Sequence, residues 1–142
     1  MKTLVISGGS SGIGKATASL FAERGWRVFE LSRHGGEEAK VERFEAKDAG
    51  EIIHVFCDVC SEESCHAAIE EVWRQTDHVD VVISNAGYGI SGPIEFSDIP
   101  AAEHQMDVNF MGAVRFTQAV LPQLRQQRRG RIIYTSSVAA IL

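Results

Sequence analysis

The 142-residue sequence lacks the marks of several classes of protein. It has no apolar run near the roughly 20 residues that cross a membrane, and Met1 leads into a strand pattern instead of a secretory leader. Its three cysteines are an odd number, which does not favour a disulfide framework. Its net charge of -5 lacks the basic excess of a nucleic-acid-binding protein. We therefore expect a cytoplasmic protein with no membrane and no nucleic acid among its partners.

Metal-binding motifs are also scarce. Cys57 and Cys60 have the Cys-x-x-Cys spacing of many zinc sites, and His54 and His66 lie nearby. No second Cys-x-x-Cys pair follows in the sequence, however, and His54 and Cys57 fall in an apolar stretch that is typical of a strand. We predict no metal site, with the thiols buried or partly exposed.

The most informative stretch is an apolar run that ends abruptly in small residues. Leu4, Val5 and Ile6 are followed by a glycine-rich segment, and a helical pattern opens at Ile13, which indicates a strand, a tight turn and a helix. Glycines there permit a sharp reversal, let phosphates approach bare backbone and let the helix pack close to the strand. The helix N-terminus adds unpaired N–H groups and a positive dipole end. The pattern predicts a pyrophosphate site at Gly8, Ser10, Ser11, Gly12, Ile13 and Gly14; the alternative is a glycine turn without a ligand.

Strand and helix patterns alternate along the rest of the chain. Apolar runs predict strands over residues 2–7, 26–32, 52–57, 79–84 and 131–135. Helical spacing predicts helices over 13–24, 61–76 and 101–127, with a short surface helix over 35–50. The sequence has no internal repeat and no evident linker, so residues 1–142 are expected to form a single domain. The alternation is typical of the α/β class, with a doubly wound parallel sheet of about five strands and helices on both faces.

The end of the second predicted strand bears on cofactor choice. Dinucleotide folds that select NAD place an acidic residue there, about 20 residues past the glycine turn, to bind the ribose hydroxyls. This sequence has Ser32 at that place, followed by Arg33. No carboxylate repels a 2′-phosphate, and a guanidinium is available to bind one. We therefore favour NADP(H) over NAD(H) and assign Ser32 and Arg33 to the cofactor; the alternative for Arg33 is a solvated loop residue.

Two motifs carry a resemblance to a known family. The spacing Gly-x-x-x-Gly-x-Gly resembles the Thr-Gly-x-x-x-Gly-Ile-Gly motif of the short-chain dehydrogenase/reductase family, with Ser7 in place of the threonine. Asn85-Ala86-Gly87 resembles that family's Asn-Asn-Ala-Gly, with Ser84 in place of the first asparagine. The resemblance implies a Rossmann-like sheet with strand order 3-2-1-4-5. It also implies hydride transfer between a nicotinamide and a carbonyl or secondary alcohol, so the expected partner is a small molecule of that class.

The same resemblance assigns further residues. It implies that Asp58 accepts a hydrogen bond from the adenine amino group with help from the backbone of Val59, although Asp58 could instead simply lead into the next helix. It places Asn85, Ala86 and Gly87 against the cofactor.

Two catalytic positions follow from the resemblance as well. Asn109, within Asp107-Val108-Asn109-Phe110, matches the asparagine that helps to hold a catalytic water, and Ser137 matches the serine that binds the substrate carbonyl.

The family's general acid/base, a Tyr-x-x-x-Lys pair, has no counterpart in this sequence. Tyr88 and Tyr134 are followed four residues later by Gly92 and Val138. We therefore expect the sheet to be incomplete at its C-terminal side and the chain alone to be inactive. Two interpretations remain: the front portion of a reductase, or a short product that binds dinucleotide or other subunits without catalysis.

Self-association is expected from two apolar surfaces. One is the edge formed by the last strand, at Ile132 and Ile133. The other is the helix over 101–127, whose stripe is typical of a core or subunit contact. The residues of that stripe are Met106, Phe110, Ala113, Thr117, Val120 and Leu124.

Overall fold

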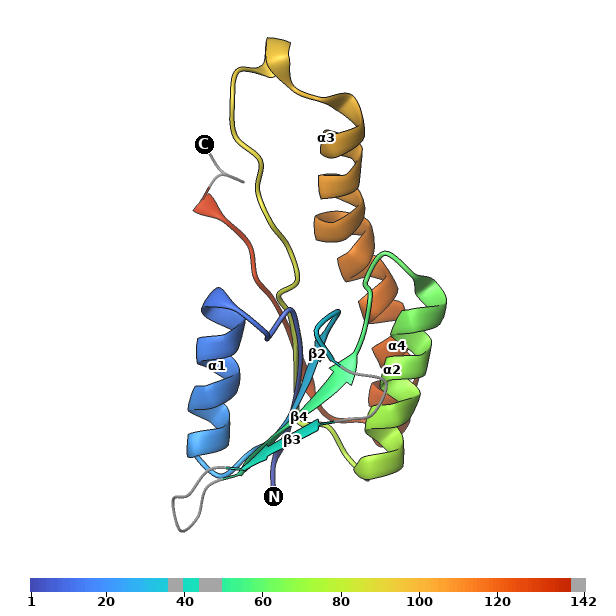
Figure 1. The fold of residues 1–142 in the computed structure, drawn as a ribbon. Helices are drawn as coiled ribbons and strands as arrows, with labels where there is room; N and C mark the ends of the chain where they lie inside the picture. The colour runs from blue at the N-terminus through green and yellow to red at the C-terminus, as the bar shows by residue number, and fades with distance from the viewer. Residues whose placement is uncertain (36–39, 44–49, 139–142) are drawn as a thin grey trace.

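The computed structural model describes residues 1–35, 40–43 and 50–138, and within them the chain forms a six-stranded sheet with helices on both faces (Figure 1). The strands are β1 (Thr3–Ser7), β2 (Arg27–Ser32), β3 (Lys40–Arg43), β4 (Glu51–Phe56), β5 (Val81–Ser84) and β6 (Arg131–Tyr134). They lie in the order β3-β4-β2-β1-β5-β6. All neighbours are parallel except β3 and β4. Without β3, this is the predicted order 3-2-1-4-5, which is confirmed.

The helices divide between the two faces of the sheet. Helix α1 (Gly12–Glu23) covers one face, and α2 (Glu62–Gln75) and α4 (Gly112–Gln127) cover the other (Figure 1). Buried apolar side chains form a separate cluster on each side. Ala18 and Ala22 of α1 pack with Leu4 and Ile6, whereas Phe116 of α4 belongs to the larger cluster on the α2 side. The doubly wound α/β fold is therefore confirmed.

The predicted surface helix over residues 35–50 is wrong where the structure describes it. Lys40–Arg43 is a strand, antiparallel to β4, with Val41 paired to Ile53. Residues 36–39 and 44–49 lie outside the described part of the chain. Four residues are too few to show whether the apolar spacing is that of a helix or a strand. Pairing with β4 also satisfies the backbone groups along the edge of β4, which a separate helix would leave unpaired. Contacts between Arg43 and Glu51 (3.8 Å) and between Glu42 and His54 (3.6 Å) accompany the pairing.

The predicted helix over 101–127 is continuous but changes its winding. It begins as α3 (Ile99–Met106), passes through a π-helical turn (Asp107–Met111) and continues as α4. A short 3₁₀ turn (Ile94–Phe96) precedes it. A π turn holds more residues than an α turn. Val120 and Leu124 are buried, whereas Met106 and Phe110 are 59% and 58% exposed. Val120 and Leu124 therefore belong to the core, and the predicted subunit contact of this helix stays a prediction.

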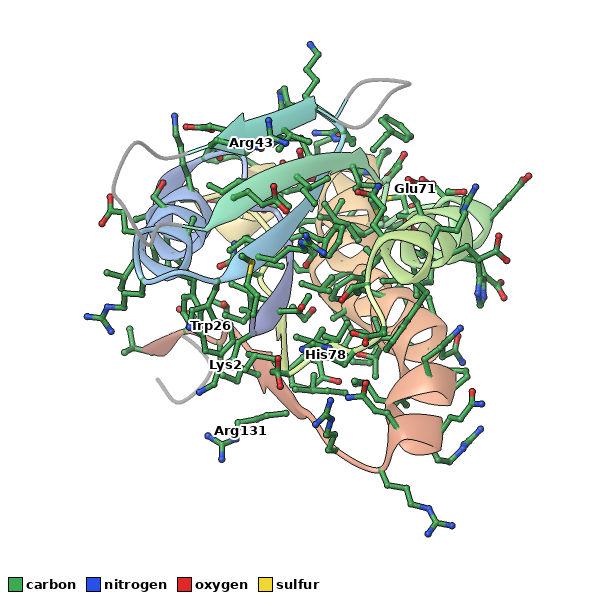
Figure 2. The ribbon with its side chains drawn as sticks, turned by 90° about the horizontal axis from the view of Figure 1, so that it is seen from below. Lys2, Trp26, Arg43, Glu71, His78 and Arg131 are labelled. Carbon is green, nitrogen blue, oxygen red and sulfur yellow. The ribbon has the colours of Figure 1, made fainter. Side chains whose placement is uncertain are left out.

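The edge at which the strands begin is closed by side-chain contacts. The Lys2 ammonium lies 5.4 Å from the centre of the Trp26 ring, at the same end of the molecule as His78 and Arg131 (Figure 2). The backbone amide of Thr3 donates to Asp80 at 2.8 Å. Such contacts fix the amino-terminal ends of the strands. No helix of the described residues is long and apolar enough to span a membrane.

Candidate functional site

The carboxyl ends of the five parallel strands meet at one edge of the sheet, and the predicted site residues follow them. The segments that begin there are Gly8–Gly14 after β1, Arg33 after β2, Asp58 and Val59 after β4, Asn85–Gly87 after β5, and Ser137 after β6. The chain winds outward in one direction from β1 to β4 and in the other from β5 to β6. The reversal lies between β1 and β5, which is where open α/β sheets bind their ligands.

The glycine turn after β1 contains two different kinds of glycine. A Cβ on Gly14 would lie 2.2 Å from the carbonyl oxygen of Gly8, and a Cβ on Gly8 would lie 2.7 Å from the Cα of Ala86. These two glycines therefore let α1 and the β5 loop pack against the turn. Gly12, with φ of +54°, has no atom within 4 Å of its Cβ position. It provides the left-handed conformation and leaves open space beside bare backbone.

The N-terminus of α1 is left without a side-chain cap. Ser11 occupies the N-cap position with extended backbone, but its hydroxyl makes no cap hydrogen bond, and the first turn holds no acidic residue. Ile13 in that first turn is 74% exposed. Ser10 Oγ lies 3.3 Å from His34 Nδ1, which places the turn beside the end of β2. Unpaired amides and a positive dipole end thus face the open space at Gly12.

Asn85 joins the ends of three strands. Its backbone amide and that of Ala86 both donate to Ser7 Oγ, at 3.0 and 3.2 Å. Its side chain donates to the Gly8 carbonyl at 3.1 Å and accepts from Thr135 Oγ1 at 3.0 Å. The substitution of serine for threonine at position 7 therefore retains the hydroxyl that the β5 loop requires.

At the end of β2, a carboxylate is present but turned inward. Glu30 is 1% exposed. Its Oε2 accepts a hydrogen bond from Ser32 Oγ at 3.2 Å and lies 2.9 Å from His54 Nδ1. Arg33 is exposed and makes no hydrogen bond or ion pair within the described residues. Sequence reasoning missed Glu30, because a single acid within an apolar run carries no sign of its buried partners.

The turn after β4 is held by its own side chains. Asp58 Oδ1 accepts from the Cys60 amide at 2.9 Å, and the Asp58 amide donates to Ser64 Oγ at 2.9 Å. Ser61 caps α2 by accepting from the Ser64 amide at 3.1 Å. Asp58 therefore does shape the entry to α2, and its predicted contact with adenine stays a prediction.

Arg115 and Gly112, which sequence reasoning missed, dock this turn onto the long helix. Arg115 donates to the Val59 carbonyl at 3.1 Å and to Asp107 Oδ1 at 2.6 Å. A Cβ on Gly112 would lie 2.8 Å from Val59 Cγ2. The hydrogen bond from Arg115 holds the pKa of Asp107 below its usual range. Burial and a hydrogen bond to Asp107 raise the pKa of the Cys60 thiol to about 11.

The other two cysteines pack against each other in the core. Cys57 and Cys65 are 2% and 0% exposed, and neither forms a disulfide. Their mutual hydrogen bond, together with burial, raises the pKa of Cys57. Cys57 and Cys60 thus lie in different surroundings, despite their Cys-x-x-Cys spacing.

Asn109 lies within the π-helical turn and clamps the loop after β5. Its Nδ2 donates to the Tyr88 carbonyl at 2.6 Å, and its Oδ1 accepts from the Tyr88 amide at 2.9 Å. Gln105 also donates to the Tyr88 carbonyl, at 3.3 Å. The structure therefore assigns Asn109 to the position of this loop, while its role toward a catalytic water stays a prediction.

Ser137 is exposed beyond the end of β6. The two tyrosines near this edge have other partners: Tyr134 Oη lies 2.7 Å from Thr117 Oγ1, and the Tyr88 ring lies 6.0 Å from that of His104. The substrate contact predicted for Ser137 is not tested by these contacts.

Comparison with known proteins agrees with this arrangement. The family model for short chain dehydrogenases matches residues 2–142. The 3-ketodihydrosphingosine reductase of Bacteroides thetaiotaomicron is 35% identical over 139 residues, which cover 98% of this chain and 48% of that protein. The chain spans about half the length of the curated relatives it matches.

Solved structures superpose on 98–100% of the chain. An alcohol dehydrogenase from the archaeon Thermococcus sibiricus, complexed with 5-hydroxy-NADP, has a TM-score of 0.83 at 28% identity and covers 100% of this chain and 61% of its own. The NADH-dependent reductase A1-R′, complexed with NAD, has a TM-score of 0.80 at 25% identity and covers 98% of this chain and 60% of its own. The glycine turn, the strand order and these matches together show that the chain belongs to the short-chain dehydrogenase family of oxidoreductases.

Proposed function

We propose that this chain binds NADP(H) at the carboxyl edge of its sheet. The observation that carries the proposal is the N-terminus of α1, where uncapped amides face the open space beside Gly12. A pyrophosphate fits this geometry, since its charge complements the dipole and its oxygens accept from the amides. Gly8 to Gly14 would hold the phosphates, and Asp58 and Val59 would hold the adenine. Asn85 to Gly87 would lie against the rest of the cofactor.

Arg33 is the residue proposed to select the phosphorylated cofactor. It lies exposed at the end of β2, beside the glycine turn, and no other described residue engages its guanidinium. The acid of this strand, Glu30, is buried and bonded to Ser32 and His54, so it is not presented to a ribose. The two solved relatives named above hold an NADP analogue and NAD, so the fold accommodates both cofactors. We therefore assign the preference for NADP(H) over NAD(H) to Arg33.

Replacement of Arg33 by alanine tests this selectivity. A hydrogen bond to a charged group contributes about 1.5–3 kcal/mol, so NADPH affinity should fall by about 10- to 100-fold, while NADH affinity stays within about twofold. Fluorescence titration with both nucleotides measures the two effects. Arg24→Ala, which removes an exposed arginine at the other end of α1, is the matched control and should change neither. Equal losses for both nucleotides would contradict the assignment.

The bound nicotinamide would supply a hydride acceptor or donor for a carbonyl or secondary alcohol. Within this chain, Ser137 would hydrogen-bond the substrate oxygen, and Asn109 would fix the loop at Tyr88 that borders the site. A positioned general acid typically contributes 10²–10⁴-fold in rate, and neither tyrosine has a lysine four residues later. We therefore predict that the purified 142-residue chain binds NADPH without ordinary turnover.

A binding module without catalysis is the second candidate, and two exposed apolar surfaces favour it. Ile99, Met106 and Phe110 lie exposed along α3 and the π turn, and Ile133 is 43% exposed on the edge strand β6. We propose self-association through one of these surfaces. Ordinary NADPH turnover by the chain alone would reject this candidate, and a chain that stays monomeric in analytical ultracentrifugation would reject the self-association.

A further inference from the structure

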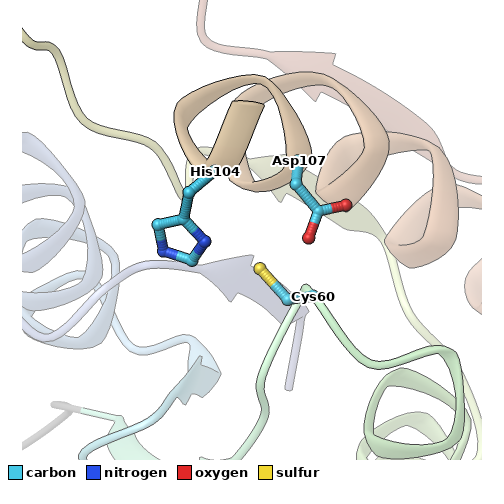
Figure 3. A group of neighbouring side chains, drawn as sticks. All are labelled: Cys60, His104 and Asp107. Carbon is cyan, nitrogen blue, oxygen red and sulfur yellow. The ribbon is translucent and has the colours of Figure 1, made fainter. Parts of the chain in front are cut away.

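Cys60, His104 and Asp107 bring three different metal-ligating groups together outside the proposed dinucleotide contacts. One ligand atom from each lies within 4.8 Å of those of the other two. Figure 3 shows the His104 ring and the Asp107 carboxylate projecting from the same helix toward the sulfur of Cys60, which rises from the turn after β4. We propose that these three side chains bind one zinc ion.

The helix accounts for two of the three ligands. His104 lies in the last turn of α3, and Asp107 follows three residues later at the start of the π turn. Residues three apart share one face of a helix, so the two side chains project toward the same point. His104 is exposed, and its ring can turn without disturbing the core.

The third ligand is brought to that face by Arg115. Its guanidinium bonds the Val59 carbonyl, next to Cys60, and also Asp107 Oδ1 at 2.6 Å. The Cys60 backbone is fixed in turn by the bond from its amide to Asp58. Arg115 thus ties the turn to the helix and orients the Asp107 carboxylate, as hydrogen-bonding partners behind metal ligands commonly do.

The donor set and the spacing favour zinc over harder cations. Sulfur, imidazole nitrogen and a single carboxylate suit Zn²⁺, whereas Mg²⁺ and Ca²⁺ prefer oxygen ligands throughout. Zinc lies about 2.3 Å from sulfur and about 2.0–2.2 Å from nitrogen or oxygen, so its tetrahedral ligands are separated by roughly 3.5 Å. The three atoms lie within 4.8 Å of one another, so they must approach by up to about 1 Å when zinc binds. Three protein ligands leave the fourth position to water, and the thiol proton passes to solvent as sulfur binds.

Cobalt titration tests the site directly. The chain, freed of metal with EDTA and kept reduced, is titrated with Co²⁺ in the absence of nucleotide, so the outcome does not depend on dinucleotide binding. We expect a thiolate-to-cobalt charge-transfer absorption that saturates at one ion per chain and disappears when Zn²⁺ displaces the cobalt. Absence of this band, or saturation only with nonspecific precipitation, would overturn the proposal.

Two variants identify the ligands. Cys60→Ser should abolish the band, and His104→Gln should weaken cobalt binding by at least about 10-fold, since loss of even an outer partner costs about 10- to 100-fold. His66→Gln is the matched control: His66 is an exposed helical histidine that lies 3.9 Å from Glu62, and its loss should change nothing. Because His104 is exposed, His104→Gln should not disturb the fold, so its weaker cobalt binding tests the site even if Cys60→Ser perturbs the turn. A band that persists in Cys60→Ser would assign the ion to Cys57 and Cys65 and reject the site.

Discussion

Two strand-to-helix turns lie at the same edge of the sheet, and they treat their helix N-termini in opposite ways. Both follow buried parallel strands, and both place a serine with extended backbone at the N-cap. At α2, Ser61 accepts from the Ser64 amide, and Glu62 and Glu63 occupy the first turn. At α1, Ser11 makes no cap bond and the first turn holds no acid.

The difference supports the proposal that the α1 turn binds an anion. The amides and the dipole of α2 are satisfied within the chain, by a hydroxyl and two carboxylates. Those of α1 face open space at Gly12 instead, so an anion from outside the chain can take the place of the missing cap. The α2 turn thus serves as an internal control for the proposed phosphate site.

The largest expected effect comes from closing the α1 turn sterically. Gly14→Ala adds a Cβ that would lie 2.2 Å from the backbone oxygen of Gly8 and 2.5 Å from Asn85 Nδ2. Backbone cannot yield as a side chain does, so we expect a loss near or above the top of the range of about 1–3 kcal/mol for overpacking, together with loss of NADPH binding. Urea unfolding and nucleotide titration measure the two effects.

Gly89→Ala is the control for that substitution. No atom lies within 4 Å of the Cβ position at Gly89, and its backbone is outside the left-handed region. Its unfolding free energy should stay within about 0.5 kcal/mol of the unsubstituted chain. If Gly14→Ala were equally neutral, the close approach of α1 to β1 would not be a requirement of the fold.

A smaller effect is expected from giving α1 the charge that α2 already has. Ser11→Asp supplies a side-chain cap and a carboxylate at the positive dipole end, which should stabilise the chain by about 0.5–1 kcal/mol. The same carboxylate repels a pyrophosphate, so NADPH affinity should fall by at least about 10-fold. Ser11→Asn adds the cap without the charge and separates the two causes. An increase in NADPH affinity with Ser11→Asp would place the phosphates elsewhere.

Much of this comparison could be read from the sequence. Apolar runs predicted the five parallel strands. Gly8 and Gly14 predicted the close packing of helix and strand at the turn, which the structure shows. The cap at Ser61 was also predictable, because a capping hydroxyl and the amide that it accepts from lie only three residues apart. These features depend on neighbours in sequence, which local patterns report. Whether the predicted residues bind a cofactor stays a prediction.

Features that depend on distant partners could not be predicted. Lys40–Arg43 is a strand only because β4 offers an open edge. Nothing in the sequence marks the π turn at Asp107–Met111 or the exposure of Met106 and Phe110. The cluster of Cys60 with His104 also needs the whole fold, since its members come from separate elements that Arg115 joins. For this reason the Cys-x-x-Cys spacing of Cys57 and Cys60 led to no predicted metal site, whereas the structure places Cys60 beside His104 and Asp107.

The smallest effect on NADPH affinity is expected when the hydroxyl of each N-cap serine is removed in turn. Ser61→Ala deletes the bond to the Ser64 amide and should lower the unfolding free energy by about 1 kcal/mol, with NADPH affinity unchanged. Ser11→Ala deletes no cap bond, so its unfolding free energy should change by only a few tenths of a kcal/mol. Urea unfolding of both variants, each with a parallel NADPH titration, measures the contrast. Equal losses of stability would mean that α1 is capped like α2 in solution, and its amides would then no longer be available to a phosphate.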